Sequence, residues 1–292
     1  MTAAAVTGTP PAVRPRTRVL RPRLAAARWL DWTVLAVVAL VTLTALLAPV
    51  LAPHDPVRTA GALYAEPGSD GALLGTDGIG RDLLSRTLIG LRTSWLMALV
   101  VVAVGLVVGG VVGLVAGAFG GWVDSVLMRV TDLFLALPAM LVAVAVAAAL
   151  GSGLWNTFLA ISVVWWPYYA RIVRGEVRSL AARPHVEAAR MAGVSRTRVI
   201  TRHLLPGVVP SAVVTASLDV GNVVLVLASL SFLGLGQSAP APELGADTSR
   251  ALAELLPHWW IPVIPGLTVM LLSLVANLGG DAVRNILARK AR

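Results

Sequence analysis

The residues of this chain that could do chemistry are few, and most of them lie in apolar surroundings. Carboxylates and amides interrupt the hydrophobic runs at five positions, which are Asp132, Asp219, Asn222, Asn277 and Asp281. A polar group inside a membrane span is costly, so it generally marks a solute path or a hydrogen bond to another helix. Asp219 and Asn222 are three residues apart and therefore share one helix face. We expect this pair either to line a translocation path or to bond a neighbouring helix.

The sequence lacks the motifs of the common enzyme classes. A phosphate-binding loop requires Gly-x-x-x-x-Gly-Lys-Ser/Thr, but the only lysine is Lys290, and Ala291 follows it. The four histidines form no His-Glu-x-x-His pattern, no Gly-x-Ser-x-Gly elbow occurs, and there are no cysteines. We therefore predict that the chain is not an enzyme, and that it holds no cofactor and no metal of its own.

The composition indicates an integral membrane protein. Of 292 residues, 57% are hydrophobic and 13% are charged, whereas soluble domains have about 45 to 50% apolar and about 25% charged residues. A span needs about 20 apolar residues, and the continuous runs favour helices over a barrel. The sequence thus predicts an all-α membrane protein with about six spans, near 32–51, 94–118, 127–150, 155–173, 208–234 and 259–280. Asn156 and Pro167 make the fourth span the weakest.

Basic residues are sorted by side across these runs. If the N-terminus lies in the cytoplasm, 19 of the 24 lysines and arginines fall on the inner side, and the outer segments hold five against eight acids. The positive-inside rule then places both termini in the cytoplasm, and the net charge of +9 does not call for nucleic acid. A cleaved signal peptide is disfavoured, because the first apolar run is longer than a signal core. The expected segments are a basic disordered cytoplasmic tail (1–31), a first span (32–51), an extracytoplasmic segment (52–93), a core (94–282) with a cytoplasmic loop (174–207), and a cytoplasmic tail (283–292).

Small residues form a ridge on the second expected span. Glycines recur there every four residues, at Gly105, Gly109, Gly113 and Gly117, and this spacing keeps them near one helix face. Small-residue ridges let helices pack closely in lipid. We expect a packing surface, with a surface that slides during opening and closing as the alternative.

The loop at 174–207 contains a predicted short helix. Pro184 suits the first turn, Glu187 near the start is favoured by the helix dipole, and Gly193 supplies a left-handed end. We expect a helix from about Arg183 to Ala192 that lies against the membrane. From this loop alone, it could dock a soluble partner or simply rest on the lipid, and the arginines around it could bind anionic headgroups.

A second polar segment lies between the first two spans, where Leu74-Gly75-Thr76-Asp77 is followed by Gly80-Arg81-Asp82 and Ser85-Arg86. Thr76 or Asp77 can cap a following helix. Four leucines then share an apolar face, which predicts an interfacial helix; they are Leu83, Leu84, Leu88 and Leu91.

Three motifs together resemble a known family. Glu187-Ala188-Ala189 with Gly193, Leu205 and Pro206 resembles the cytoplasmic loop of bacterial ABC importer permeases. The Leu74 to Arg86 segment resembles the signature of the C-type permease subunits of dipeptide, oligopeptide and nickel importers. The order Leu230-Ser231-Phe232-Leu233-Gly234, then Pro240 and Pro242, then Asn277 to Asp281 also occurs in that subfamily. The motifs span residues 70 to 285.

The resemblance implies a type I importer fold, with five core helices after an extra first one, in the bacterial cytoplasmic (inner) membrane. It implies contact with an ATPase through Glu187, Ala188, Ala189 and Gly193, with Leu205 and Pro206 leading into the fifth span. The implied partners are a homologous B-type permease, two ABC ATPase subunits that hold the ATP and Mg, an extracytoplasmic substrate-binding protein and membrane lipid. The implied cargo is a di- or oligopeptide. A nickel chelate or another small solute is the alternative, and an ion-gradient-driven transporter is a less favoured class, because no paired midplane charges or internal repeats are evident.

Overall fold

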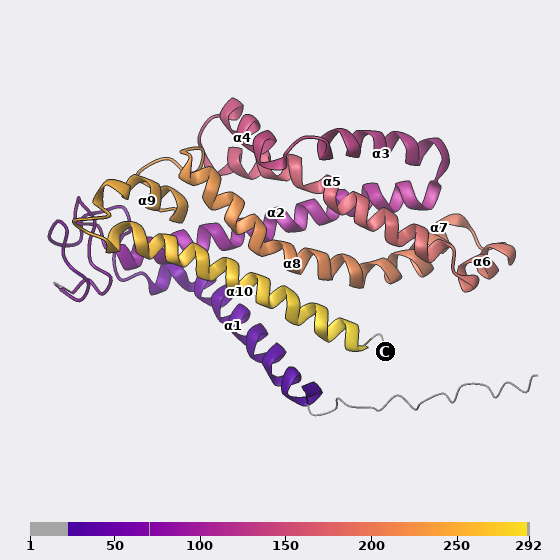
Figure 1. Ribbon diagram of the computed structural model, residues 1–292, viewed down its shortest axis with the longest axis horizontal. Coiled ribbons are helices and arrows are strands. Elements are labelled where there is room, and N and C mark those ends of the chain that lie inside the picture. The colour runs from indigo at the N-terminus through magenta and orange to yellow at the C-terminus, as the bar shows by residue number, and fades with distance from the viewer. Residues whose placement is uncertain (1–22, 70, 291–292) are drawn as a thin grey trace, which may run out of the picture.

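The protein is an elongated bundle of helices in the computed structural model, which describes residues 23–69 and 71–290 (Figure 1). The long helices are α1 (Arg23–Leu51), α2 (Leu83–Phe119), α5 (Leu154–Ala181), α8 (Leu205–Phe232) and α10 (Trp260–Lys290). The short ones are α3 (Gly121–Leu135), α4 (Ala139–Leu150), α6 (Pro184–Met191), α7 (Arg196–Val199), the π-helix η1 (Ile200–Leu204), α9 (Leu244–Arg250) and the 3-10 helix η2 (Leu252–Glu254). The predicted all-α architecture is confirmed.

Four helices are long and apolar enough to cross a membrane by themselves: Trp29–Leu51, Leu83–Phe119, Arg196–Phe232 and Trp260–Arg289. A fifth span results if α3 and α4 are taken together. The fourth expected span (155–173) corresponds to α5, which is about 42 Å long at 1.5 Å per residue but does not meet the same test of apolarity among the described residues. Polar and charged side chains along α5 are the reason.

The third expected span is broken. We expected one helix over 127–150, but α3 and α4 meet at a bend of 83°. Pro138 occupies the N-cap position of α4 with an extended ψ of 116°. Proline has no N–H for the helix ladder, and its ring clashes with the preceding turn, so the chain turns at this residue.

Several helix ends differ from the expected segments. α1 begins at Arg23 and α10 reaches Lys290, so parts of both expected tails are helical; residues 1–22 and 291–292 of those tails lie outside the described residues. At the far end of α10, Asn285 donates to Asp31 of α1 over 3.1 Å and Arg289 pairs with the same carboxylate. Asp31 thus bonds α1 to α10 in the parts of both helices that lie beyond the apolar runs.

The expected interfacial helix is the first turns of α2. The N-cap of that helix is Asp82, whose carboxylate accepts the backbone N–H of Ser85 over 2.9 Å. The expected caps, Thr76 and Asp77, lie further upstream and do not cap it. Leu83 is buried. The apolar face that sequence assigned to the membrane surface therefore belongs in part to the protein interior.

Residues 52–69 and 71–82 form a folded unit with α9 at one end of the bundle, which we call the cap (Figure 1). The Thr76 hydroxyl donates to the carbonyl of Ala62 over 2.6 Å and accepts the N–H of Ala65 over 2.8 Å. Asp77 accepts the N–H groups of Ile79 and Arg81, each over 3.0 Å. Thr76 and Asp77 of the Leu74 to Arg86 motif therefore hold the cap in its fold through these hydrogen bonds.

Arg86 joins the cap to the bundle. Its guanidinium donates to the carboxylate of Asp247 in α9 over 2.6 Å, and to the carbonyls of Pro56 and Pro240 over 2.8 and 3.2 Å. The Arg86 side chain is 3% exposed and that of Asp247 is 12% exposed. Burial raises the pKa of Asp247, and Arg86 opposes the rise. This buried pair fixes α9 over the start of α2.

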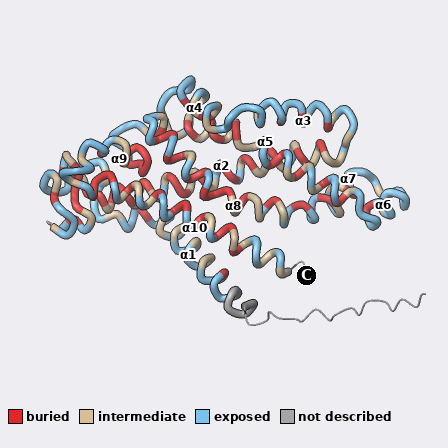
Figure 2. The backbone as a smooth tube through the Cα atoms, in the orientation of Figure 1, coloured by how far each residue is buried: buried red, intermediate tan, exposed pale blue. Residues whose placement is uncertain are grey.

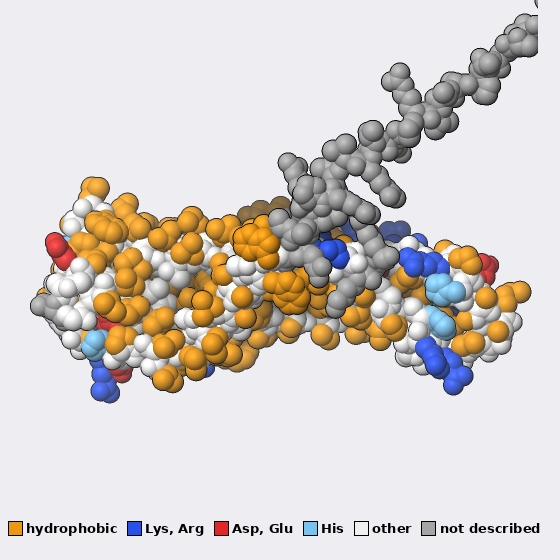
Figure 3. Space-filling model, turned by 90° about the horizontal axis from the view of Figure 1, so that it is seen from below, with side chains coloured by type: hydrophobic (Ala, Val, Ile, Leu, Met, Phe, Trp, Pro, Cys, Tyr) orange, Lys and Arg blue, Asp and Glu red, His pale blue; other side chains and the backbone are white. Residues whose placement is uncertain are grey.

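The buried residues lie along the middle of the bundle, where α2, α5, α8 and α10 meet (Figure 2). The face seen in Figure 3 is mostly hydrophobic along its middle, and charged side chains gather toward its two ends. This distribution suits a protein whose middle lies in lipid and whose ends lie in water.

Candidate functional site

The best-defined candidate site is the turn of chain between α5 and α8, at the end opposite the cap (Figure 1). α6 covers Pro184–Met191, with Arg183 as its N-cap and Pro184 in its first turn. Gly193 follows with φ of +77°. Its N–H bonds to the carbonyl of Arg190 over 3.0 Å, and that of Val194 bonds to Ala189 over 3.1 Å. These two bonds are a Schellman end, which requires a left-handed residue at Gly193.

α6 has one buried face and one exposed face. Val186 is fully buried and packs into a cluster with Val177, Leu180 and Leu204, from α5 and η1. Glu187 and Ala188 are exposed, Ala189 is half-buried, and α5 ends at Ala181 and not at 173 as the loop boundary assumed. The exposed face therefore carries a carboxylate beside a small side chain, on a helix that a single valine anchors to the bundle.

Met191 completes that exposed face. Its side chain is 87% exposed, although methionine is an adaptable apolar side chain that commonly packs at binding surfaces. The outward face of α6 thus offers a small apolar contact with a carboxylate next to it.

Arg196 ties this segment to the end of α2. Its guanidinium donates to the carbonyl of Phe119 over 3.1 Å and lies 4.6 Å from the Phe119 ring centre. The last carbonyls of a helix are partly negative and favour a cation. Arg196 therefore links α7 directly to the end of α2.

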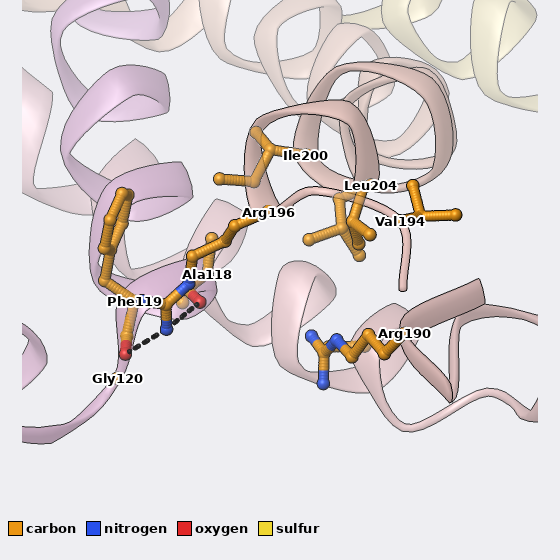
Figure 4. A pocket seen from close by; sticks show the side chains of 11 residues that line it. Ala118, Phe119, Gly120, Arg190, Val194, Arg196, Ile200 and Leu204 are labelled. Atoms are coloured by element: carbon orange, nitrogen blue, oxygen red, sulfur yellow. Dashed lines mark hydrogen bonds between the residues drawn. The ribbon is translucent and has the colours of Figure 1, made fainter. Parts of the chain in front are cut away.

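A cavity of about 500 Å³ lies between these elements. Figure 4 shows Arg196 reaching across it to Phe119, and Arg190 pointing toward it from the end of α6. Leu204, Ile200 and Val194 supply its apolar wall. The cavity thus lies between the end of α2, the end of α6 and the start of α8.

The segment enters α8 through a π-helical turn at Ile200–Leu204. Pro206 lacks an N–H, and its ring crowds the carbonyl four residues earlier, which favours the wider turn. Leu205 is exposed and Pro206 lies in the first turn of α8, whereas the neighbouring Leu204 is 1% exposed and packs in the interior. Leu205 and Pro206 thus lie at the start of α8, the helix over the fifth expected span.

The five polar residues found in apolar runs lie at separate places. Asp219 is 7% exposed and accepts hydrogen bonds from Tyr169 over 2.8 Å and from Trp165. Asn222 is exposed and donates to Asp219 over 3.3 Å. The other three pair with neighbours: Asp132 with Arg171, Asp281 with Arg284, and the Asn277 amide with Ser273. Asp219 thus joins α8 to α5.

The four glycines of α2 lie against α5. A Cβ at Gly109 would be 2.2 Å from the Trp166 carbonyl, and one at Gly113 would be 2.4 Å from that of Ala170. Gly117 and Gly105 face Val177 and Tyr169 at 2.8 and 3.1 Å. The two helices therefore approach too closely for any larger residue at the middle two positions.

Comparison with known proteins gives the family. The family described as the binding-protein-dependent transport system inner membrane component matches residues 109–292. The chain is 38% identical over 255 residues to the probable D,D-dipeptide transport system permease protein DdpC of Escherichia coli, with 87% of this chain and 86% of that protein covered. It is 39% identical over 259 residues to the di/tripeptide transport system permease protein DppC of Pseudomonas aeruginosa, with the same coverage of 87% and 86%. The chain belongs to this permease family.

A solved structure shows the same fold. An inward-facing form of the MetNI methionine ABC transporter aligns with a TM-score of 0.53 at 21% identity, over 68% of this chain and 94% of that one. The permease is accordingly a multi-pass inner-membrane subunit of an ABC transport system and not an enzyme. Membership implies an ATPase and a binding protein as partners.

Sequence reasoning about the permease overlooked four contributors to the site. Val186 and Arg196 attach the segment, and Met191 extends its exposed face; Trp165 bonds Asp219. Val186 and Met191 carried a signal in the sequence, as apolar residues inside an arginine-rich loop. The other contacts join residues that are far apart in the chain.

Proposed function

We propose that this permease forms half of the translocation path of an ATP-driven importer of short peptides. The relatives are named for D,D-dipeptide and di/tripeptide transport, and each is covered by this chain over most of its length. The observation that carries the proposal is the exposed face of α6, with Glu187, Ala188 and Met191 outward. A small apolar surface beside a carboxylate fits a groove of an ATPase subunit that offers a basic group.

The proposed assembly contains a homologous B-type permease, two ABC ATPase subunits and an extracytoplasmic substrate-binding protein. ATP and Mg would be bound by the ATPase subunits. The charge distribution supports an orientation with α6 and both termini in the cytoplasm and the cap outside. Anionic lipid headgroups are the proposed partners of arginines near α6 that have no described acceptor, such as Arg198 and Arg202.

The geometry around α6 suggests how its movement would reach the spans. Val186 packs into the cluster between α5 and α8, and Arg196 is hydrogen-bonded to the end of α2. Asp219 holds α5 to α8. A displacement of α6 would thus act on several spans together, so that the nucleotide state of the ATPase biases the outward or inward form. Such coupling between two separate sites is allosteric.

The test is uptake of a labelled dipeptide into proteoliposomes that contain the full transporter. Glu187→Ala and Ala188→Trp alter the exposed face of α6 and leave Val186 and Gly193 in place. Both should reduce ATPase association and vanadate-sensitive uptake. Glu66→Ala is the matched control, because Glu66 is an exposed carboxylate in the cap. Equal uptake by the Glu187→Ala, Ala188→Trp and Glu66→Ala proteins would refute the proposal.

A further inference from the structure

One face of α5, the helix over the fourth expected span, carries exposed polar side chains. Tyr168, Arg171, Gly175 and Arg178 are all exposed, and their spacing of three, four and three residues places them on one side of the helix. We call these four residues the α5 stripe. In contrast, the exposed sides of α1 and α2 carry residues such as Leu40 and Val107, which are 62% and 64% exposed. The α5 stripe does not suit contact with lipid.

The α5 stripe includes an exposed ion pair with α3. Arg171 bonds to Asp132, and each side chain is 56% exposed. α3 runs alongside α5 (Figure 1), with a second pair of Arg174 and Asp124 nearer its start. The two helices therefore present charge along a common outer edge.

The depth of this pair can be worked out from the helix lengths. Arg171 precedes the end of α5 at Ala181 by ten residues, and Asp132 follows the start of α3 at Gly121 by eleven. At 1.5 Å per residue, both lie about 15 Å from the same ends of their helices. With the inner edge of the hydrocarbon core placed at these two helix ends, the pair lies about halfway across a core of about 30 Å, which is deeper than the inner end of the 155–173 run, where the charge count placed Arg171.

An ionised pair at that depth requires water or polar partners. Charged side chains within a membrane generally face the interior of a bundle or a water-filled cavity, because exposure to lipid is costly. Asp219, in comparison, is buried and already bonded to Trp165 and Tyr169. Asp219 therefore has less freedom to meet a passing solute than Asp132 and Arg171.

We propose that the α5 stripe, with Asp132 on α3, lines the water-filled translocation path, and that Arg171 and Asp132 contact the charged ends of the solute. This inference rests on the proposed function and goes beyond it, because it names the path wall and its solute contacts. A zwitterionic peptide fits the pair, since its carboxylate can bond the Arg171 guanidinium and its ammonium can bond the Asp132 carboxylate. The alternative occupant of this face is the partner permease, packed against it without water.

The chain has no cysteine, so single cysteines can report water access directly. Gly175→Cys and Tyr168→Cys leave the ion pair intact, and a Cβ at Gly175 has nothing within 4 Å. The controls are Leu40→Cys and Val107→Cys on apolar exposed faces. In the full transporter in proteoliposomes, a charged, membrane-impermeant methanethiosulfonate should modify the two stripe positions much faster than the controls. Vanadate trapping should change the stripe rates. Stripe rates as slow as the controls, or unchanged by vanadate, would overturn the path assignment.

Solute contact is tested by the uptake kinetics of Arg171→Gln. Loss of a charge-assisted hydrogen bond costs about 1.5 to 3 kcal/mol, which corresponds to about tenfold or more in kcat/KM. That loss should affect a free dipeptide and spare the same peptide with an amidated C-terminus. Equal effects on both peptides, or none, would overturn the contact. Absence of ATP-dependent peptide uptake by the unsubstituted transporter would instead refute the proposed function.

Discussion

Removal of Arg86, which joins the cap to the bundle, should strongly destabilise the protein. Arg86→Met leaves the carboxylate of Asp247, which is 12% exposed, with only the longer 3.6 Å pair to the more exposed Arg250, and leaves the carbonyls of Pro56 and Pro240 without the Arg86 donor. Breaking a buried ion pair from one side costs about 3 to 5 kcal/mol. Arg58→Met is the control, because Arg58 pairs with Asp55 at 85% and 50% exposure and such pairs contribute less than about 1 kcal/mol.

The free energy of unfolding can be measured by titration with sodium dodecyl sulfate from mixed micelles, with the nine tryptophans as the probe. The double variant Arg86→Met with Asp247→Leu should be more stable than Arg86→Met alone, because no buried charge is left over. The single variant should also regain stability at lower pH. Burial holds the folded pKa of Asp247 above its unfolded value, so protonation relieves the penalty as the pH falls. A cost of Arg86→Met as small as that of Arg58→Met would refute the reasoning.

Three further predictions concern single residues. Gly113→Ala should lower the free energy of unfolding by about 1 to 3 kcal/mol, because its Cβ would lie 2.4 Å from a backbone carbonyl oxygen. Gly110→Ala is the control, because a Cβ there has nothing within 4 Å, and it should be neutral or stabilise by up to about 1 kcal/mol. Unfolding titrations compare the two variants directly. Gly193→Ala should destabilise the end of α6 by about 1 to 2 kcal/mol, because a side chain disfavours the φ of +77° at this position, and Gly193→Asn should destabilise it less. Hydrogen exchange of the α6 amides measures the difference. Equal protection of these amides in both variants would contradict the conformational argument. Burial raises the pKa of Glu243 in the folded protein above its value in the unfolded chain, so the free energy of unfolding should fall as the pH rises from the unfolded to the folded pKa. Glu243→Gln should abolish this pH dependence in unfolding titrations. An unchanged pH dependence would mean that another group causes it.

The parts of the fold that depend on local chemistry could be predicted from the sequence. α6 was expected from Arg183 to Ala192 and lies at Pro184–Met191, because a proline start and a glycine end act within one or two turns. The apolar runs likewise located the long helices. The bend at Pro138 was missed because the apolar run continues through it, although the proline itself was a signal.

The parts that depend on distant contacts could not be predicted. Arg86 and Asp247 are 161 residues apart in the chain, and nothing near either residue indicates the other. The same holds for Asp219, whose partners on α5 lie 50 and 54 residues away. The sequence showed that Asp219 was unusual for a span, but its burial and bonding follow only from how α5 and α8 pack.

The central claim is that the exposed face of α6 receives the ATPase, and protection of Met191 tests it most directly. A cysteine introduced as Met191→Cys can be modified by a maleimide in the permease alone and in the assembled transporter. Leu63→Cys is the control, because Leu63 is 62% exposed in the cap. The account predicts that ATPase assembly slows modification at Met191→Cys and leaves Leu63→Cys unchanged. Equal rates at Met191→Cys with and without the ATPase would contradict it.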